Sequence, residues 1–464
     1  MRARLVWPPY PYKAGFCVTD DTDAATFEQV KAVYDFLMSK GFRTTKTVWP
    51  FTPIDKCGIP PLPNSTLRGV TLEDKRYLDY CKVLHDRGFE ICLHGASAGN
   101  NTRQRTRDAF DFLARNLPGS DTFICHAKNA DNIYWEHKIV SLPLLGRLLK
   151  LYSKHTCSGE IESSPYFWGD LCREKVNQIR LFRTRCTNTL QRNPSMPYFD
   201  RRKPYVNGWF SATKRRLADC ADPRVLDRLK RDYGLTVLYQ YLHRYARPDT
   251  WELDPRFQQS ISNITADPEI LVDTASCLMK RLRLIQGLFV VYGRRAFWLV
   301  NTNQEDVPQV QMALARRPSR VSSDGGTTIH DDRLVFPVVP ASALVSVTTS
   351  EPWRFPGRRC KRLNRPRRVT FQTPSGPLFV NLSEAPWRTG RSLTVAAHSL
   401  FYQSQESPSG RVPRSVLTAR EEIRLTFDQV WILAREILFK GRSLDLNAFL
   451  DDTKEIKLED HDNW

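Results

Sequence analysis

The chain has 464 residues, more than a single hydrophobic core usually serves, so two or three domains are expected. Its content of 41% hydrophobic and 11% aromatic residues excludes a fibrous or disordered protein. The formal net charge of +19 favours an anionic partner, but no zinc-finger, RNP or helix-turn-helix signature accompanies it, so a nucleic-acid function is not expected.

Neither a membrane span nor a secretion signal is expected. No run of about 18 apolar residues occurs, and prolines and tyrosines occupy the stretch from Met1 to Tyr12 where a signal peptide is apolar. The eleven cysteines form no Cys-x-x-Cys pair, and several lie inside apolar runs, as Cys17, Cys92 and Cys125 do. We therefore expect reduced thiols, a cytoplasmic location and no cysteine zinc site.

Positive charge is concentrated between Arg354 and Arg368, where eight of fifteen residues are basic. Such a run fits an acidic glycan, an anionic membrane surface or nucleic acid, and it equally fits a solvated linker that keeps the protein in solution. The sequence leaves both interpretations open.

The first 250 residues or so alternate short apolar runs with amphipathic stretches, the pattern of βα units around a parallel sheet or barrel. A strand is expected at Phe16 to Thr19, followed by a helix at Thr26 to Lys40. A second strand at Arg43 to Val48 precedes a helix from Leu72 to Arg87, with Thr71 as its N-cap.

Histidines follow three later strands of this region. The expected strands and their histidines are Phe89 to Leu93 with His94, Thr122 to Cys125 with His126, and Leu235 to Tyr241 with His243. In a βα barrel the C-terminal ends of the strands meet at one rim, where the loops converge. We therefore expect these histidines at one site.

After about residue 285 the pattern changes to short strands separated by turn signals, which predicts a smaller β-sandwich. A final helix is expected from Phe427 to Lys440, followed by an acidic tail. The predicted fold is thus of the α/β class, with a (β/α) barrel at 1–285, a β-sandwich domain at 286–405 and a C-terminal helical segment at 406–464.

The strongest chemical signal is the run Phe16 to Asp23, FCVTDDTD, in which an apolar strand leads into three carboxylates. Carboxylates this close repel one another unless a cation or a proton lies between them. A divalent metal meets this need, with one aspartate as a ligand and its neighbour free to take a proton from water. Helix capping by Thr22 or Asp23 explains one of the acids and not all three.

Together with Glu90 to Gly95 (EICLHG) and Val237 to His243 (VLYQYLH), this run resembles the motif series of the polysaccharide deacetylase family of carbohydrate esterases, the NodB-homology proteins. The resemblance covers roughly residues 10 to 250 and lies in the order and strand context of the motifs. It implies a distorted, seven-stranded (β/α) barrel. It also implies roles for four residues: Asp20 as general base, Asp21 and His94 as metal ligands, and His243 as general acid.

One position departs from the family's pattern. The family places a second histidine ligand four residues after the first, and this chain has Ala98 there. His126 is the candidate for the missing imidazole, unless it is only hydrogen-bonded locally. Asn100 or Asn101 could instead supply an amide oxygen, a weaker ligand for zinc.

The resemblance further implies an arginine that orients the base and an aromatic wall near the acid. Arg180 and Arg183 lie at a suitable place in the chain for the arginine, and Trp209 is a candidate for the wall. Arg183 and Trp209 are accordingly predicted to bind substrate.

The function that the resemblance implies is a metal-dependent hydrolase, with zinc the expected divalent ion, that removes N- or O-acetyl groups from an amino sugar or polysaccharide. The positive net charge allows that substrate to be anionic. One alternative, suggested by Ala98, is a degenerate barrel that binds a sugar without turnover. Another is a glycoside hydrolase, which needs a second acid across the site. The acids nominated for that role are Glu160, Glu162 and Asp170.

Overall fold

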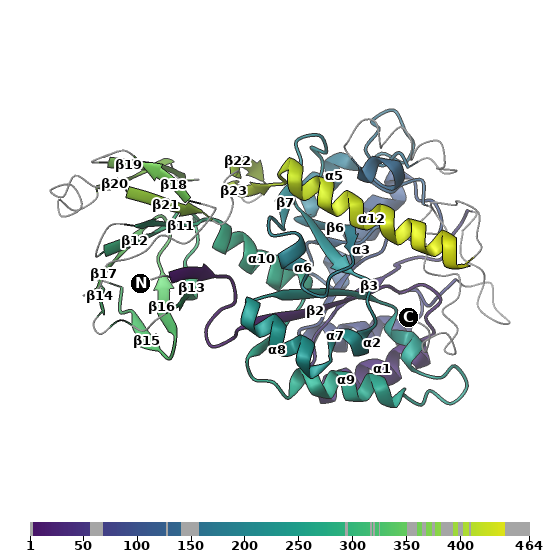
Figure 1. Ribbon diagram of the computed structural model, residues 1–464. Coiled ribbons are helices and arrows are strands. Elements are labelled where there is room, and N and C mark those ends of the chain that lie inside the picture. Colours follow the sequence, from purple (N-terminus) through teal and green to yellow (C-terminus); the bar gives the residue numbers. More distant parts are fainter. Residues whose placement is uncertain are drawn as a thin grey trace. The chain divides into compact units, whose positions relative to one another are not determined.

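The computed structural model contains two compact units (Figure 1). Residues 15–194, 200–278 and 419–464 form one, here called the barrel unit, and residues 1–14, 195–199 and 279–418 form the other, here called the β-rich unit. The structure describes residues 3–55, 68–126, 129–140, 157–292, 296–315, 318, 321–323, 325–349, 360–363, 368–373, 376–381, 393–397, 402–407 and 410–440. Most of the basic run at 354–368 and all of the acidic tail at 441–464 lie outside these ranges.

Seven parallel strands form a closed barrel, because the last strand pairs with both the sixth and the first. In barrel order the strands are β2 (Ala14–Asp20), β3 (Thr45–Val48), β4 (Glu90–Leu93), β5 (Thr122–Phe123), β6 (Gln178–Thr184), β8 (Trp209–Thr213) and β9 (Leu235–Gln240). The barrel is distorted, since β5 has only two residues and the pairing of β6 with β8 shifts register between Arg180 and Arg183. The predicted seven-stranded (β/α) barrel is confirmed.

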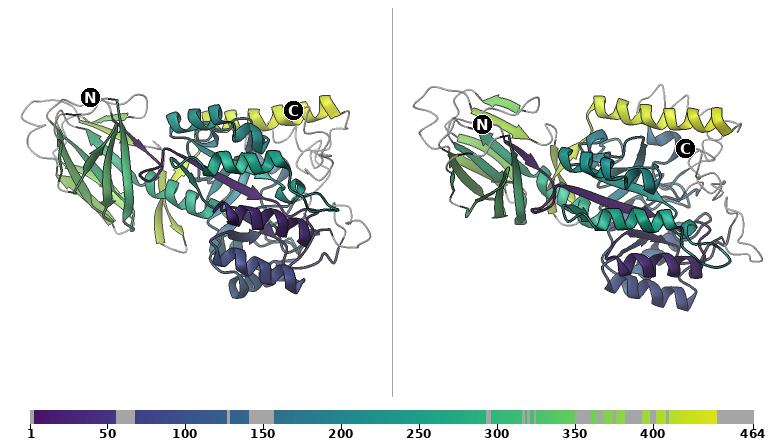
Figure 2. Two further views of the ribbon diagram at one scale, coloured as in Figure 1. Left: turned by 90° about the horizontal axis from the view of Figure 1, so that it is seen from below. Right: turned by 60° about the horizontal axis from the view of Figure 1, so that its bottom comes forward.

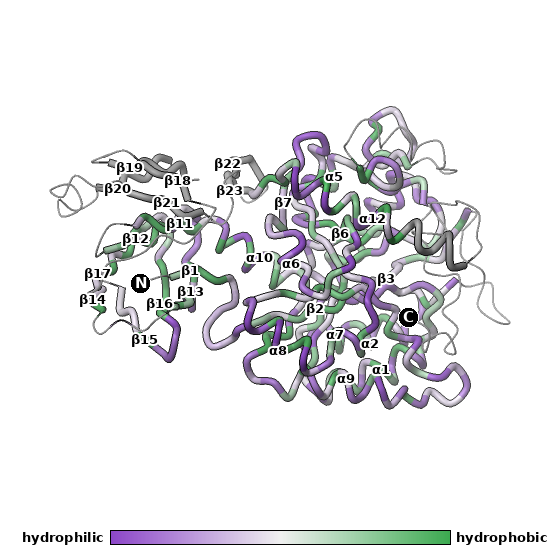
Figure 3. Tube along the Cα trace, viewed as in Figure 1, coloured by the Kyte–Doolittle hydropathy of each residue, from purple (hydrophilic) through white to green (hydrophobic). Residues whose placement is uncertain are grey.

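Helices surround the strands and turn one face inward. Figure 3 shows hydrophilic and hydrophobic residues alternating along outer helices such as α9. The helices are α1 (Phe27–Ser39), α2 (Lys75–Asp86), α3 (Arg103–Asn116), α5 (Gly169–Lys175), α6 (Thr189–Arg192), α7 (Leu217–Cys220), α8 (Pro223–Asp232), α9 (Pro255–Thr265) and α10 (Ala275–Gln286), with 3-10 turns η1 (Glu136–Ile139) and η2 (Leu242–Tyr245) and a short strand β10 (Ile270–Val272) beside β2.

Two helix boundaries differ from the prediction. α2 begins at Lys75 and not at Leu72, because the carboxylate of Asp74 accepts hydrogen bonds from the backbone N–H groups of the first turn and thereby caps the helix. The predicted C-terminal helix is present as α12 (Ala419–Lys440) and begins eight residues before Phe427. Its first turns carry the charged residues Glu421 and Glu422, which hid the helix from a search for apolar periodicity.

The β-rich unit holds antiparallel sheets, as expected after residue 285. Its four-stranded sheet has the order β1 (Ala3–Val6), β13 (Val307–Leu314), β16 (Arg333–Val339) and β15 (Thr328–His330). Its six-stranded sheet has the order β14 (Val321–Ser323), β17 (Leu344–Thr349), β12 (Ala296–Asn301), β11 (Leu288–Tyr292), β21 (Leu393–Ala397) and β18 (Cys360–Leu363). The remaining strands are the pair β19 (Arg368–Thr373) and β20 (Gly376–Asn381), and β22 (Tyr402–Ser407), β23 (Gly410–Val416) and β7 (Tyr198–Phe199).

Figure 2 shows the strands of this unit in two further views, and side chains of its two larger sheets meet inside it. The rings of Phe297 and Phe336 lie 6.3 Å apart, and the hydroxyl of Tyr292 donates to the carbonyl of Ala3 at 3.2 Å. The N-terminal strand β1 therefore belongs to the β-rich unit, an arrangement that the sequence did not indicate. The linear division at residues 285 and 405 stays a prediction.

Two general expectations can be compared with the described residues. Nine of the cysteines in these ranges are free thiols, and seven of these nine are completely or almost completely buried. None of the helices in the same ranges combines the length and the apolar character that a membrane span requires.

Candidate metal centre

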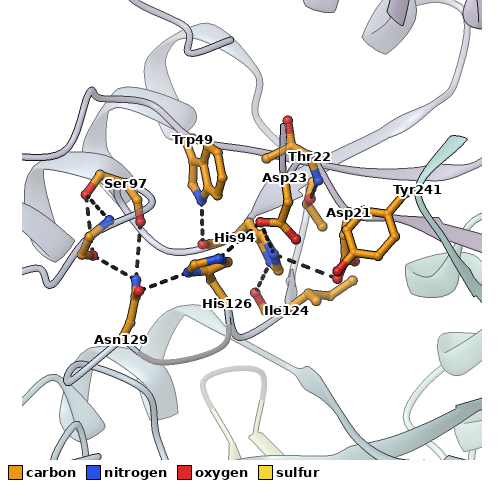
Figure 4. Close-up of polar contacts among 12 residues, drawn as sticks. Asp21, Thr22, Asp23, Trp49, His94, Ser97, Ile124, His126, Asn129 and Tyr241 are labelled. Atoms are coloured by element: carbon orange, nitrogen blue, oxygen red, sulfur yellow. Dashed lines mark hydrogen bonds and ion pairs between the residues drawn. The ribbon is translucent and has the colours of Figure 1, made fainter. Parts of the chain in front are cut away.

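Three buried side chains converge at one end of the barrel (Figure 4). One ligand atom from each of Asp23, His94 and His126 lies within 4.8 Å of the other two. Oδ1 of Asp23 is 3.1 Å from Nε2 of His126 and 3.5 Å from Nε2 of His94. The three side chains are 2–3% exposed. Two imidazole nitrogens and a carboxylate oxygen form a donor set typical of catalytic zinc sites.

The topology of the barrel explains why these residues meet. Asp23 follows the end of β2, His94 follows β4 at once, and His126 lies three residues after β5. In parallel strands the carboxyl ends share one rim, so loops distant in sequence meet there. The structure thus brings together two of the three strand-end histidines that the sequence singled out, whereas His243 is neither in this cluster nor in the lining of the adjoining pocket.

Each histidine is held in one tautomer by a hydrogen bond on its far side. Nδ1 of His94 lies 2.8 Å from the carbonyl oxygen of Ile124, which can only accept, so Nδ1 carries the proton. Nδ1 of His126 lies 2.9 Å from Oδ1 of Asn129. Oδ1 of Asn129 is identified as the oxygen because its Nδ2 donates to the carbonyls of Ser97 and Gly99. Both rings therefore present the lone pair of Nε2 to Asp23, as metal-binding histidines do.

The electrostatics of the cluster also fit a cation. Burial raises the pKa of Asp23, but the neighbouring His126 and His94 outweigh it and hold that pKa well below its ordinary value. Oδ1 of Asp23 and Nε2 of His94 find no hydrogen-bond partner among the described residues. A divalent ion bound by Asp23, His94 and His126 would satisfy both of these atoms and would place positive charge beside the carboxylate.

Asp21 faces the same site from outside this ligand set. The guanidinium of Arg180 binds both of its oxygens, at 3.0 Å and 2.7 Å, and also donates to the hydroxyl of Thr19 at 2.9 Å. Oδ2 of Asp21 remains 3.7 Å from Nε2 of His94. The sequence assigned metal binding to Asp21; in the structure both oxygens of Asp21 contact the guanidinium, and it is Asp23 that lies with the two histidines.

Asp20 lies in a different environment. Its Oδ2 pairs with the buried ammonium of Lys46 at 2.9 Å and accepts a hydrogen bond from the hydroxyl of Tyr34 at 2.8 Å. Its Oδ1 accepts from the backbone N–H of Leu242 at 2.7 Å. The sequence assigned the general base to Asp20, but Asp20 does not line the pocket beside the cluster, whereas Asp21 does.

His243 lies on η2 directly after Leu242, so the hydrogen bond that Leu242 donates to Asp20 fixes the turn that carries His243. Its ring is buried, and Nδ1 has no hydrogen-bond partner among the described residues. Burial, with the positive charges of Arg244 and Lys46, holds the pKa of His243 well below its ordinary value. The free protein therefore carries a neutral imidazole here at pH 7.

The position of the missing family histidine is filled differently in this chain. Ala98 packs in a small buried apolar cluster with Trp49. The indole of Trp49 stacks on His94 with ring centroids 6.0 Å apart, meets His126 edge-on at 5.4 Å and donates from Nε1 to the carbonyl of His94 at 3.0 Å. Trp49 thus supports both histidines. In the sequence, the only indication of this role is that Trp49 directly follows β3.

The amide alternatives are engaged elsewhere. Nδ2 of Asn101 donates to the carbonyl of Gly99 at 2.8 Å and to Asp131 at 3.2 Å, and its Oδ1 accepts from Ser97 at 2.7 Å. Asn100 bonds to Asp55 and to the backbone of Ala130. Neither amide is directed at the cluster, and Asn101 instead supports the loops that carry the ligands.

A pocket adjoins the cluster, and only one of the two predicted substrate-binding residues lines it. Arg183 lines it, whereas Trp209 is fully buried in β8 against Tyr134 and does not. The aromatic wall is supplied by Trp135, which the sequence did not single out. The lining residues are Asp21, Asp23, His94, Cys125, Trp135, Arg180, Leu181, Arg183, Tyr239 and Tyr241.

Comparisons with known proteins give likeness in structure only. No family model and no curated protein matches the chain. Among solved structures, a putative polysaccharide deacetylase from Mycobacterium smegmatis is 10% identical, with a TM-score of 0.34, over 60% of this chain and 93% of that one.

Two other solved structures are similar to the same degree. The allantoinase Puue is 10% identical over 59% of this chain and 93% of that one, with a TM-score of 0.34. The carbohydrate deacetylase Agd3 is 10% identical over 74% of this chain and 66% of that one, with a TM-score of 0.38. The structures similar to this chain thus include polysaccharide deacetylases, the class of protein that the sequence motifs resemble. Any assignment of chemistry to this chain rests on the residues of the chain itself.

Proposed function

We propose that the protein is a metal-dependent hydrolase that removes acetyl groups from an amino sugar or its polymer. The observation that carries the proposal is the convergence of Asp23, His94 and His126 beside a second carboxylate, Asp21, that is held apart from them. Two histidines and one carboxylate leave coordination positions open for water and substrate, as a catalytic ion requires. Zinc suits these nitrogen and oxygen donors.

Asp21 has the properties of a general base. A divalent ion bound by the three ligands would polarise the acetyl carbonyl and acidify water beside it. The carboxylate of Asp21 takes the proton of the attacking water, while Arg180 fixes its direction through two charge-assisted hydrogen bonds. The side chain of Tyr239 supports Arg180, whose guanidinium lies 3.9 Å from the centre of that ring.

His243 is the proposed general acid. Since its ring is neutral in the free protein, it gains its acidic proton within the cycle, from the water proton that Asp21 accepts. The ring then gives that proton to the leaving amine or alcohol of the sugar. Acetate and the deacetylated sugar result, and both side chains return to their starting charge.

A sugar is the proposed substrate. Trp135 and Tyr241 line the pocket and carry aromatic rings, which sugar rings commonly contact. Nε1 of Trp135 is a buried donor without a hydrogen-bond partner among the described residues, so a substrate oxygen would satisfy it. Arg183, which also lines the pocket, is proposed to bind the substrate and would favour an anionic one.

The two alternative functions have less support. A glycoside hydrolase needs a second acid facing the first across the site. Of the nominated acids, Glu160 pairs with Lys138, Glu162 accepts from Tyr205 and Asp170 pairs with Arg103, and none of them lines the pocket. A degenerate barrel was suggested by Ala98, but His126 makes the set of three ligand atoms complete.

The test combines metal analysis with acetate release from a panel of acetylated amino sugars. The wild-type protein should hold one zinc-like ion, and Asp23→Ala and His126→Ala should lose both ion and activity. Asp79→Ala, on the exposed face of α2, is the matched control and should keep both. A wild-type protein that binds neither zinc nor any other divalent ion would refute the hydrolase proposal.

A further inference from the structure

The C-terminal helix α12 binds the barrel through its charged side. Asp428 is completely buried and pairs with Arg185 at 3.0 Å and with Arg192 at 2.6 Å. Glu422 is 6% exposed and pairs with Arg202 at 3.0 Å. The helix is thus anchored by buried ion pairs, an unusual inner face for a helix on a protein surface, which normally turns its apolar side inward.

The outer side of α12 is apolar as a consequence. Ile423, Phe427 and Trp431 follow one another at every fourth residue, which places them in one row along the helix. They are 53%, 67% and 39% exposed. This row of three residues is here called the apolar stripe. It belongs to α12, the yellow helix of the barrel unit in Figure 1.

The charges around the stripe are of one sign. Arg420 is exposed and Arg424 is half-buried, whereas the acids Glu421, Glu422 and Asp428 of the same helix are all buried against the barrel. Among the side chains of α12 that the structure describes, the outer side therefore offers apolar groups and positive charge only. Arg185, which lies over the Trp431 ring at 4.3 Å, adds a further cation at the edge.

We propose that the apolar stripe docks the protein onto the surface of an anionic lipid bilayer. A helix with aromatic and aliphatic residues on one side, flanked by arginines, inserts that side among lipid headgroups and draws its cations to anionic lipids. The net charge of +19 acts in the same direction. Two copies of the chain meeting at this face would instead bring positive charge against positive charge.

The side of α12 opposite the stripe contacts a residue of the pocket. The buried side chain of Gln429 accepts a hydrogen bond from the backbone N–H of Arg183 at 3.1 Å, and the side chain of Arg183 lines the pocket. Docking itself does not depend on the chemistry of the pocket, so the hydrolase proposal and the docking proposal can fail separately.

The test is co-sedimentation of the full chain with vesicles of phosphatidylcholine alone and of phosphatidylcholine mixed with phosphatidylserine. Wild-type protein should bind the mixed vesicles, and salt should weaken the binding. Phe427→Ser should lower the partition coefficient roughly tenfold, because the phenyl ring no longer leaves water. Val83→Ser removes an exposed apolar side chain of α2 and is the matched control, which should bind as wild type does.

A second variant tests the charge without touching the stripe. Arg420→Gln should weaken binding to mixed vesicles about fivefold and leave the weak binding to phosphatidylcholine unchanged. Melting temperatures of all variants should match that of wild type, since the altered side chains point to solvent. The proposal would be overturned if wild-type protein bound neither vesicle type, or if Phe427→Ser bound the mixed vesicles as strongly as wild type does. A dimer that only Phe427→Ser dissociates, without vesicle binding, would assign the stripe to a second copy.

Discussion

The guanidinium of Arg180 binds the carboxylate of Asp21 through two parallel hydrogen bonds, 3.0 Å and 2.7 Å long, in a buried setting. Such a fork-shaped contact fixes the plane of the carboxylate. Asp23, two residues later in the chain, faces two imidazoles instead. The two aspartates therefore have different partners although they lie close together in the sequence.

The two aspartates should give different results when each is neutralised. Asp21→Asn should keep the metal and lower kcat by roughly 10²- to 10⁴-fold, the usual effect of losing a general base. Asp23→Asn should lose the metal as well, because an amide is a poor ligand for zinc. The measurements are metal stoichiometry and acetate release. Metal loss in Asp21→Asn with metal retained in Asp23→Asn would reverse the assignment.

Asn129 should control metal affinity without touching the metal. Asn129→Leu removes the acceptor that fixes the proton on Nδ1 of His126, and metal affinity should fall by about 10- to 100-fold. Asn129→Asp keeps an acceptor there and should retain most of the affinity, although it loses the donor to Ser97 and Gly99. Competition with a chelator gives the affinities. Equal losses in the two variants would mean that Asn129 only supports the loop.

A histidine placed where the family has its second ligand should not rescue the site. In His126→Ala/Ala98→His, the new imidazole meets Trp49, which fills the space beside Ala98, so metal binding should stay lost. Adding Trp49→Ala makes room but also removes the ring that braces His94. Metal analysis of the double variant tests this prediction, and a stoichiometric ion in that variant would contradict it.

The buried pair of Lys46 and Asp20 should contribute to stability and not to chemistry. Lys46→Met leaves the carboxylate of Asp20 buried without its cation, which should cost about 3–5 kcal/mol of unfolding free energy. Lys46→Met/Asp20→Asn removes both charges and should recover a large part of this loss. Urea unfolding measures the three proteins. If the double variant were no more stable than Lys46→Met, the loss of stability in Lys46→Met could not be attributed to the unpaired carboxylate of Asp20.

Asp131 should make the protein less stable as the pH rises from about 4 to about 6. Burial raises its pKa from 3.8 to about 6, against the opposing hydrogen bonds from Asn101. Because the folded state binds the proton more tightly, its contribution is fully present below pH 4 and is lost by pH 6, to the extent of about 3 kcal/mol. Asp131→Asn should unfold with a smaller dependence on pH across this range. An unchanged dependence would assign the pH effect to other groups.

The fold and half of the site followed from local patterns in the sequence. The period of apolar residues gave the alternation of strands and helices, and it gave the histidines at strand ends, because these patterns are properties of neighbouring residues. His94 and His126 were identified in this way, and so was the need for a cation among the aspartates of FCVTDDTD. The N-cap of α2 was predicted at Thr71, whereas in the structure the carboxylate of Asp74 caps the helix by accepting from the backbone N–H groups of Arg76 and Tyr77.

The sequence by itself determined that a parallel barrel would form and that carboxylates and imidazoles would gather at the carboxyl ends of its strands. It could not assign tasks to Asp20, Asp21 and Asp23, since a carboxylate takes its role from the group it faces. Lys46, Arg180 and His126 come from three other strands or loops, and only closure of the barrel brings each of them to its aspartate. The same holds for α12, where the buried ion pairs with Arg185 and Arg192 decide which side of the helix meets water.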